Sequence, residues 1–208
     1  MAEAYQRQSP LAHLQLFAAG TNAPEESGVI MREHAHRTMI TLRADVSDEA
    51  VRAAVVGHVG MAPPSEALTA ITKGNRAILW MGPDEWLIVA PADERESLPA
   101  SLTGALASRH AAVVEVGESM TVIALTGPRA ADVVSKGCTI DLHPSVFPSG
   151  IVVRTLLAKT GIILHQVSDT SSGDAPTYEI YVHRSFADYA WRWLEDAGLE
   201  YGVAIAGG

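Results

Sequence analysis

Three features that would place a chain in a familiar class are missing from these 208 residues. Cys138 is the single cysteine, so no internal disulfide framework can form. No apolar run approaches the roughly 18 to 20 residues that a membrane-spanning helix requires. No lysine and arginine cluster offsets the formal net charge of -9, which would repel a phosphate backbone on average. The sequence therefore argues against a disulfide-stabilised scaffold, a helical membrane protein and a nucleic-acid-binding protein.

The expected compartment follows from the lone thiol and from the start of the chain. A secreted protein would rarely leave one cysteine unpaired. Residues 1–8 are polar and lack the apolar stretch of a secretory signal peptide. We therefore expect a cytoplasmic protein.

Charged residues are also scarce. They make up 19% of the chain, whereas apolar residues reach 48%; ordinary domains carry about 25% charged residues. Two explanations are open at this point. Either a partner chain buries part of the apolar surface, or an alanine-rich sequence packs an unusually large interior.

The order of predicted elements runs twice along the chain. Residues 39–42 and 122–125 each resemble a strand followed by a short helix, further strands, a strongly apolar strand and a closing helix. This repetition predicts an α+β protein of two pseudo-repeated half-domains, each a small, mostly antiparallel sheet with packed helices. We expect an extended N-terminal arm over 1–36, a first half over 37–110 and a second half over 111–208, with the two halves packed as one unit.

Local patterns support this division. A strand is expected over 37–43, and Ser47 offers a hydroxyl as the N-cap of a helix. The buried stripe of that helix is expected to be Val51, Val55 and Val59. A strand over 111–116 has no clear equivalent in the first half and is a candidate to bridge the two.

The N-terminal arm carries four large apolar side chains among polar neighbours. These are Leu11, Leu14, Leu16 and Phe17. Apolar side chains at this density have a reason to lie on a surface, which is either this domain or a partner chain. We include the four as candidate partner-interface residues.

The closing helix supplies one more interface candidate. Its expected stripe is Phe186, Ala190, Trp193 and Ala197, because residues advance about 100° each around a helix. Trp191 falls roughly 140° from Phe186 and should be exposed. Tryptophan is enriched at protein interfaces, so Trp191 is predicted to contact another subunit.

Ionisable side chains form no convincing site by pattern alone. His34 and His36 lie two residues apart, but zinc needs three or four protein ligands and no accompanying motif is present. Cys138 lies near His143, yet a nucleophilic thiol requires a base oriented within hydrogen-bond reach. A packed thiol is the simpler interpretation. We expect no catalytic, cofactor-binding or metal-binding residues in this chain.

Several blocks of the sequence resemble a known family. Residues 78–87, 137–144 and 147–150, taken together over most of the chain, are similar to the gamma subunit of heterotetrameric sarcosine oxidase. Residues 123–130 and 158–161 more distantly resemble the strand, Gly-Pro turn and Thr-Gly element of folate-binding aminomethyltransferases, the T-protein of glycine cleavage and its relatives.

The resemblance implies a complex of alpha, beta, gamma and delta subunits that oxidatively demethylates sarcosine to glycine, with formation of hydrogen peroxide and 5,10-methylenetetrahydrofolate. It also implies that FAD, FMN, NAD, tetrahydrofolate and zinc belong to the other subunits. The gamma chain of that family carries no recognised active site. The expected function is therefore that of a non-catalytic structural subunit of a flavin-dependent amine oxidase.

Two alternatives stay open. One is a free-standing folate-binding or aminomethyltransferase-like one-carbon protein. Against it, Ile163, Leu164 and His165 stand where the transferases continue with a second Thr-Gly and a carboxylate near the pterin. A pterin needs a carboxylate or amide matched to its donor edge, which an apolar pair does not supply. The other alternative is a related oxidase complex acting on another N-methylated amine.

Overall fold

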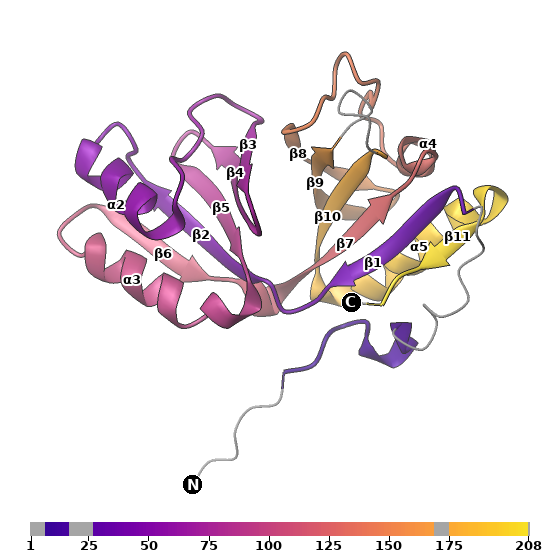
Figure 1. Ribbon diagram of the computed structural model, residues 1–208, viewed down its shortest axis with the longest axis horizontal. Coiled ribbons are helices and arrows are strands. Elements are labelled where there is room, and N and C mark those ends of the chain that lie inside the picture. Colours follow the sequence, from indigo (N-terminus) through magenta and orange to yellow (C-terminus); the bar gives the residue numbers. More distant parts are fainter. Residues whose placement is uncertain (1–6, 17–26, 169–174, 208) are drawn as a thin grey trace, which may run out of the picture.

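A computed structural model describes residues 7–16, 27–168 and 175–207, and it consists of two α+β halves that lie side by side (Figure 1). Each half is a β-sheet with helices on its outer face, and the two sheets diverge like the arms of a V. The predicted α+β class and the two mostly antiparallel sheets are confirmed.

The first sheet contains five antiparallel strands in the order β3-β4-β5-β2-β6. These strands are β2 (Thr38–Ala44), β3 (Ala70–Lys73), β4 (Arg76–Gly82), β5 (Glu85–Ala90) and β6 (Ala111–Glu115). Helices α2 (Glu49–Val59) and α3 (Ser97–Ala105) cover its outer face. Both helices bury a leucine or valine stripe in a core that they share with the strands.

The second sheet contains six strands in the order β11-β1-β7-β10-β9-β8. These strands are β1 (Val29–His34), β7 (Met120–Thr126), β8 (Val152–Leu157), β9 (Thr160–Ser168), β10 (Thr177–His183) and β11 (Val203–Ile205). The pair β1–β11 is parallel, and the other neighbours are antiparallel. Helices α4 (Ala130–Ser135) and α5 (Ala187–Gly198) pack on its outer face.

Helix α2 shows how closely local chemistry determines an element. Its predicted stripe of Val51, Val55 and Val59 is buried, as expected. The N-cap is Asp48, whose side chain accepts a hydrogen bond from the Ala50 amide. The prediction of Ser47 as the cap is wrong by one residue, because its hydroxyl donates instead to the Asp45 carboxylate at 2.6 Å.

The two halves exchange a strand. Strand β1 directly precedes β2 in the chain but pairs with β7 of the second sheet, while β6 directly precedes β7 but pairs with β2 of the first sheet. Each repeat therefore reads strand-strand-helix-strand-strand-strand-helix, and its first strand lies in the sheet of the other repeat. Strand β6, for which the sequence showed no clear equivalent in the first half, therefore corresponds to β1, the first strand of the first repeat.

This exchange changes the expected boundaries of the parts. Residues 29–34, expected within an extended arm, form an interior strand of the second sheet. Residues 111–115, expected in the second half, form the edge strand of the first sheet. Neither segment carries a local pattern that identifies its partner strand, because pairing between residues far apart in the sequence leaves no local signal.

The inner faces of the sheets meet in a third core. Its members come from both halves: Met39, Ala77, Leu79, Met81, Leu87, Val89, Val122, Val152 and Tyr181. A short antiparallel bridge between Thr69 and Ile151 also joins the edge of the first sheet to that of the second. The halves are thus joined by the exchanged strands, by a common core and by the backbone bridge between Thr69 and Ile151.

Replacement of Gly127 by alanine is expected to destabilise the exchanged arrangement strongly. Gly127 follows β7 with φ +138°, and a Cβ there would meet the backbone of Gly28 and lie 3.0 Å from the Cα of Val29. We expect a loss of roughly 2 to 4 kcal/mol in the free energy of unfolding, measured by urea denaturation. Gly104→Ala is the control, because open space surrounds Gly104 on α3. An equal loss in both variants would contradict this reading of the β1–β7 junction.

Candidate functional site

The N-terminal segment packs on its own chain. Leu11 is fully buried in the core of the second half, and Leu14 and Leu16 pack partly buried against the same core. The open question about this segment is thus answered for Leu11, which presents no surface to a partner. Phe17 lies outside the described residues.

The prediction that Trp191 is exposed is wrong. Its side chain is 1% exposed and belongs to the core of the second half. The buried face of α5 runs through Ala187, Ala190, Trp191, Leu194 and Gly198. Phe186, from which the stripe was counted, lies in a short 3₁₀ turn before the helix and is 48% exposed. The count therefore began outside the helix, and Trp191 offers no surface to another subunit.

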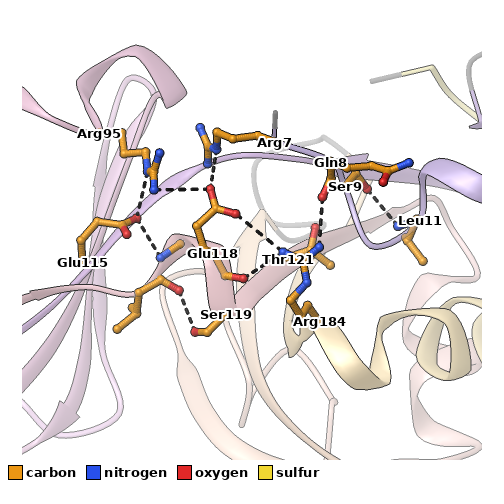
Figure 2. Close-up of polar contacts among 12 residues, drawn as sticks. Arg7, Gln8, Ser9, Leu11, Arg95, Glu115, Glu118, Ser119, Thr121 and Arg184 are labelled. Carbon is orange, nitrogen blue, oxygen red and sulfur yellow. Dashed lines mark hydrogen bonds and ion pairs between the residues drawn. The ribbon is translucent and has the colours of Figure 1, made fainter. Parts of the chain in front are cut away.

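Glu118 lies where the arm and both halves meet (Figure 2). It follows β6 in a 3₁₀ turn, Gly117–Ser119, that leads into β7. Its carboxylate pairs with Arg7 of the arm, with Arg95 at 3.6 Å from the first half and with Arg184 at 3.6 Å from the second. Arg184 also donates to the main-chain oxygens of Glu118 and Gln8. One carboxylate thus joins three parts of the fold.

A second carboxylate, this one buried, anchors the same segment. Glu33 on β1 is 8% exposed and accepts hydrogen bonds from Ser9 at 2.6 Å and from Thr121 at 2.7 Å. The Ser9 hydroxyl in turn accepts from the Leu11 amide. The pairing of Glu33 explains why a carboxylate is tolerated in this interior strand.

A third carboxylate, Glu179 on β10, lies among two imidazoles and a phenol. The Tyr181 hydroxyl donates to Glu179 Oε2 at 2.6 Å. Nδ1 of His34 lies 3.4 Å from Oε1, and Nδ1 of His165 lies 3.7 Å from Oε2. Burial alone would raise the pKa of Glu179, but the interactions with His165, His34 and Tyr181 outweigh it, so the pKa lies well below its usual value.

This cluster joins β1 to the consecutive strands β9 and β10, which lie far along the chain from it. His34 ends β1, His165 lies on β9, and Glu179 and Tyr181 lie on β10. Burial and the charge of Glu179 raise the pKa of Tyr181 well above its usual value, so its phenol keeps its proton. A negative carboxylate held by a phenol and flanked by two imidazoles is an arrangement that fixes strand positions.

A cleft of about 530 Å³ lies between the inner faces of the two sheets. Its wall is mainly apolar, with Met81 and Leu87 from the first sheet and Met120 and Ile163 from the second. Arg154 of β8 reaches across the cleft to form an ion pair with Glu85 of β5. The cleft combines an apolar wall with charged groups at its border.

The residues expected to disfavour a pterin occupy three different surroundings. Leu164 is fully buried in the outer core, and His165 is 1% exposed beside Glu179. Ile163 alone lines the cleft. The cleft wall contributed by β9 is therefore apolar, and no carboxylate from that strand reaches it.

The other candidates from the sequence are also dispersed. His34 ends β1, whereas His36 lies in the following turn with φ 61°, so the two do not share a strand face. Cys138 is 5% exposed and lies 3.8 Å from the Thr155 hydroxyl, and His143 contacts Ser145 instead. Within the described ranges, no three His, Cys, Asp or Glu side chains are grouped to hold a metal ion.

The clusters around Glu118 and Glu179 were missed by sequence reasoning. Glu179 gave one weak signal, since it is a carboxylate within the otherwise apolar strand pattern of 178–182. Glu118 gave none, because its three arginine partners come from distant parts of the chain.

The paired half-domains define the class of protein. The fold matches the glycine cleavage aminomethyltransferase T of Bartonella henselae with a TM-score of 0.65, at 12% identity, over 90% of this chain and 56% of that one. The molecule therefore shares its fold with part of that aminomethyltransferase.

Residues 43–200 match the family described as "Sarcosine oxidase, gamma subunit family", and the chain belongs to that family. It is 33% identical to the sarcosine oxidase subunit gamma of Corynebacterium sp. strain U-96, over 95% of this chain and 93% of the relative. A chain of the heterotetrameric sarcosine oxidase structure from Corynebacterium sp. U-96 superposes with a TM-score of 0.81 and 32% identity, over 94% of this chain and 96% of that chain.

Every helix within the described residues lacks the combination of length and apolarity that a membrane crossing demands.

Replacement of Glu179 by glutamine is expected to lower stability by about 2 kcal/mol near pH 7, the usual scale for removing a charged hydrogen-bond partner. Because the native pKa is depressed, this contribution is complete above the unfolded carboxyl pKa of about 4.3 and is lost as the pH falls below it. Urea denaturation at pH 7 and below pH 4 should therefore show a gap between wild type and variant that narrows in acid.

Asp84→Asn is the matched control, because Asp84 forms an exposed pair with Arg43. Its effect should stay within about 0.5 kcal/mol at both pH values. A gap for the Glu179 variant that widens in acid would contradict the depressed pKa.

Replacement of Glu118 by alanine is expected to loosen the N-terminal segment. The loss leaves Arg7 and Arg95 without their shared carboxylate, while Glu118 is partly exposed, so we expect a modest cost of about 1 kcal/mol. Amide hydrogen exchange over residues 9–16 should accelerate more than exchange at the core amides that open only when the whole protein unfolds. Glu200→Ala, which removes the exposed partner of Lys136, is the control; equal acceleration in both variants would contradict the assigned role of Glu118.

Proposed function

We propose that this chain is the non-catalytic gamma subunit of a heterotetrameric sarcosine oxidase and acts as a structural component. The observation that carries the proposal is similarity over nearly the full length of both chains. It holds for the curated Corynebacterium relative, and for the chain of the solved heterotetramer. Agreement over more than nine tenths of each chain supports the same place in the same kind of assembly.

In this proposal the partners are the alpha, beta and delta subunits. The complex oxidatively demethylates sarcosine to glycine, with formation of hydrogen peroxide and 5,10-methylenetetrahydrofolate, in the cytoplasm. FAD, FMN, NAD, tetrahydrofolate and zinc are assigned to the partner subunits. The contribution of this chain is a rigid surface against which larger subunits are held.

The placement of polar groups supports a structural role. Glu33, Glu118 and Glu179 each pair with groups of this same chain and tie its parts together. Large apolar side chains are meanwhile exposed in several places, including Val114 at 51%, Val146 at 59%, Leu156 at 59% and Leu199 at 66%. Burial of such surface against a partner gains about 25 cal/mol per Å².

Co-expression tests the proposal. The alpha, beta and delta chains are produced with and without this chain, and the products are compared by gel filtration, flavin absorbance and sarcosine-dependent peroxide formation. We expect an equimolar four-chain complex of higher thermal stability when this chain is present. Recovery of this chain as a monomer, with an unchanged three-chain complex, would refute the structural role.

A folate titration of the isolated chain addresses the alternative. The likeness to the aminomethyltransferase at 12% identity concerns the fold alone. Ile163, which lines the cleft, supplies an apolar side chain and no carboxylate for the donor edge of a pterin. Saturable micromolar binding of a reduced folate, measured by calorimetry, would favour the one-carbon protein instead.

A further inference from the structure

We propose that the open edge of strand β6 receives an extended segment of a partner subunit, which adds an antiparallel strand to the first sheet. The segment places a large apolar side chain opposite Val114. This inference rests on the proposed function, because it names the part of the chain through which a structural subunit would hold a larger one.

Strand β6 lies at one edge of the first sheet, and within the described residues β2 is its only neighbouring strand. The Val116 amide donates to the Met39 carbonyl at 2.8 Å. In an antiparallel pair such bonds recur at every second residue, so Val114 also bonds to β2. Val113 and Glu115 therefore direct their amides and carbonyls away from β2, toward the open edge.

The edge of β6 lacks the usual protection against strand addition. Natural edge strands are protected by charged side chains, by proline, by bulges, by shortness or by a covering segment. Residues 111–115 read Ala-Ala-Val-Val-Glu, and their one charge lies at the end. By contrast, β3 has four residues including Lys73, and β11 has three. Strand β8 carries Arg154, and its Val152 amide donates to the Leu68 carbonyl of the other half.

An exposed apolar side chain accompanies the unpaired backbone. Val114 is 51% exposed, and Ala112 beside it is also exposed. Both lie on the face of β6 that holds Val116, which packs against the inner core. Ala111 and Val113 point to the other face and pack against the helices. An added strand would therefore find its apolar contact on the inner face.

The ladder geometry states what that contact should be. Because Val114 bonds to β2, its neighbour on an added antiparallel strand belongs to a pair without mutual hydrogen bonds. Side chains approach each other most closely in such pairs, with Cα atoms about 4.5 Å apart. Aromatic and β-branched side chains gain most from this position. The residue opposite Val114 is accordingly expected to be of that kind.

The open groups of the edge select an extended polypeptide as the occupant. Val113 and Glu115 each offer an amide and a carbonyl, two residues apart, and an added strand matches that spacing. The Ala111 amide is already bonded to the Arg109 carbonyl at 3.0 Å, so the donors begin at Val113. A second copy of this chain would bring the same formal net charge of -9, which opposes self-association. The three other chains of the proposed complex carry no such restriction.

Amide hydrogen exchange tests the backbone pairing directly and needs no variant. In the isolated chain, followed by nuclear magnetic resonance, the amides of Val113 and Glu115 should exchange faster than that of Val114. In the co-expressed four-chain complex, mass spectrometry of peptides covering residues 111–115 should show about two further protected amides.

A competition experiment tests the contact at Val114. Val114→Lys places a charge on the edge at a half-exposed position, and Val56→Lys is the matched control because Val56 is 41% exposed on α2 of the same half. Tagged variant and untagged wild-type chains are co-expressed with the alpha, beta and delta chains, and their shares in the purified complex are measured. We expect a share of Val114→Lys at least about tenfold below wild type, and an equal share of Val56→Lys. Thermal unfolding of the purified variants verifies that both are folded.

The outcomes separate this inference from the proposed function. A wild-type chain that fails to join the complex overturns the proposed function and the docking edge together. A chain that joins while its Val113 and Glu115 amides exchange as in the isolated state overturns the docking edge alone. Equal shares of Val114→Lys and wild type, or an equal deficit in both variants, also overturn it. Protection of the same amides in a dimer of the isolated chain would assign the edge to a second copy instead.

Discussion

The reciprocal pairing of β1 with β7 and of β6 with β2 is the constraint on which the molecule depends. Each sheet is completed by a strand that belongs, by chain order, to the other repeat. Neither half can satisfy the backbone hydrogen bonds of its own sheet alone. The shared inner core and the Thr69–Ile151 bridge add to a union that the exchange already requires.

Paired carboxylates reinforce this union at three points. Glu33, Glu118 and Glu179 lie on or beside strands that pass between the halves, and each is paired within the chain. Glu33 is 8% exposed, so the loss of its partners would leave a buried charge uncompensated. Glu118 is partly exposed, and its pairs contribute less. The paired polar groups of this fold therefore favour one arrangement of strands.

Patterns confined to one element could be predicted from the sequence. The valine stripe of α2 follows from helical spacing, and the alternation over Thr38–Ala44 indicates its strand. The exchange of β1 could not be predicted, because its partners lie far along the chain. Trp191 was misplaced because the helical phase was counted from Phe186, outside the helix. The Glu179 cluster likewise depends on the register of three strands, which no local pattern encodes.

The strand exchange has a consequence for synthesis on the ribosome. Strand β1 emerges early, yet its partner residues on β7 extend to Thr126, and β11 follows only at Val203–Ile205. Until β7 has been translated, the nascent chain carries β1 as an unpaired strand, with Val29 and Met31 uncovered. Such long-range pairing is slow and exposes edges to aggregation. The beginning of the polypeptide is therefore open to non-native pairing until β7 has left the ribosome.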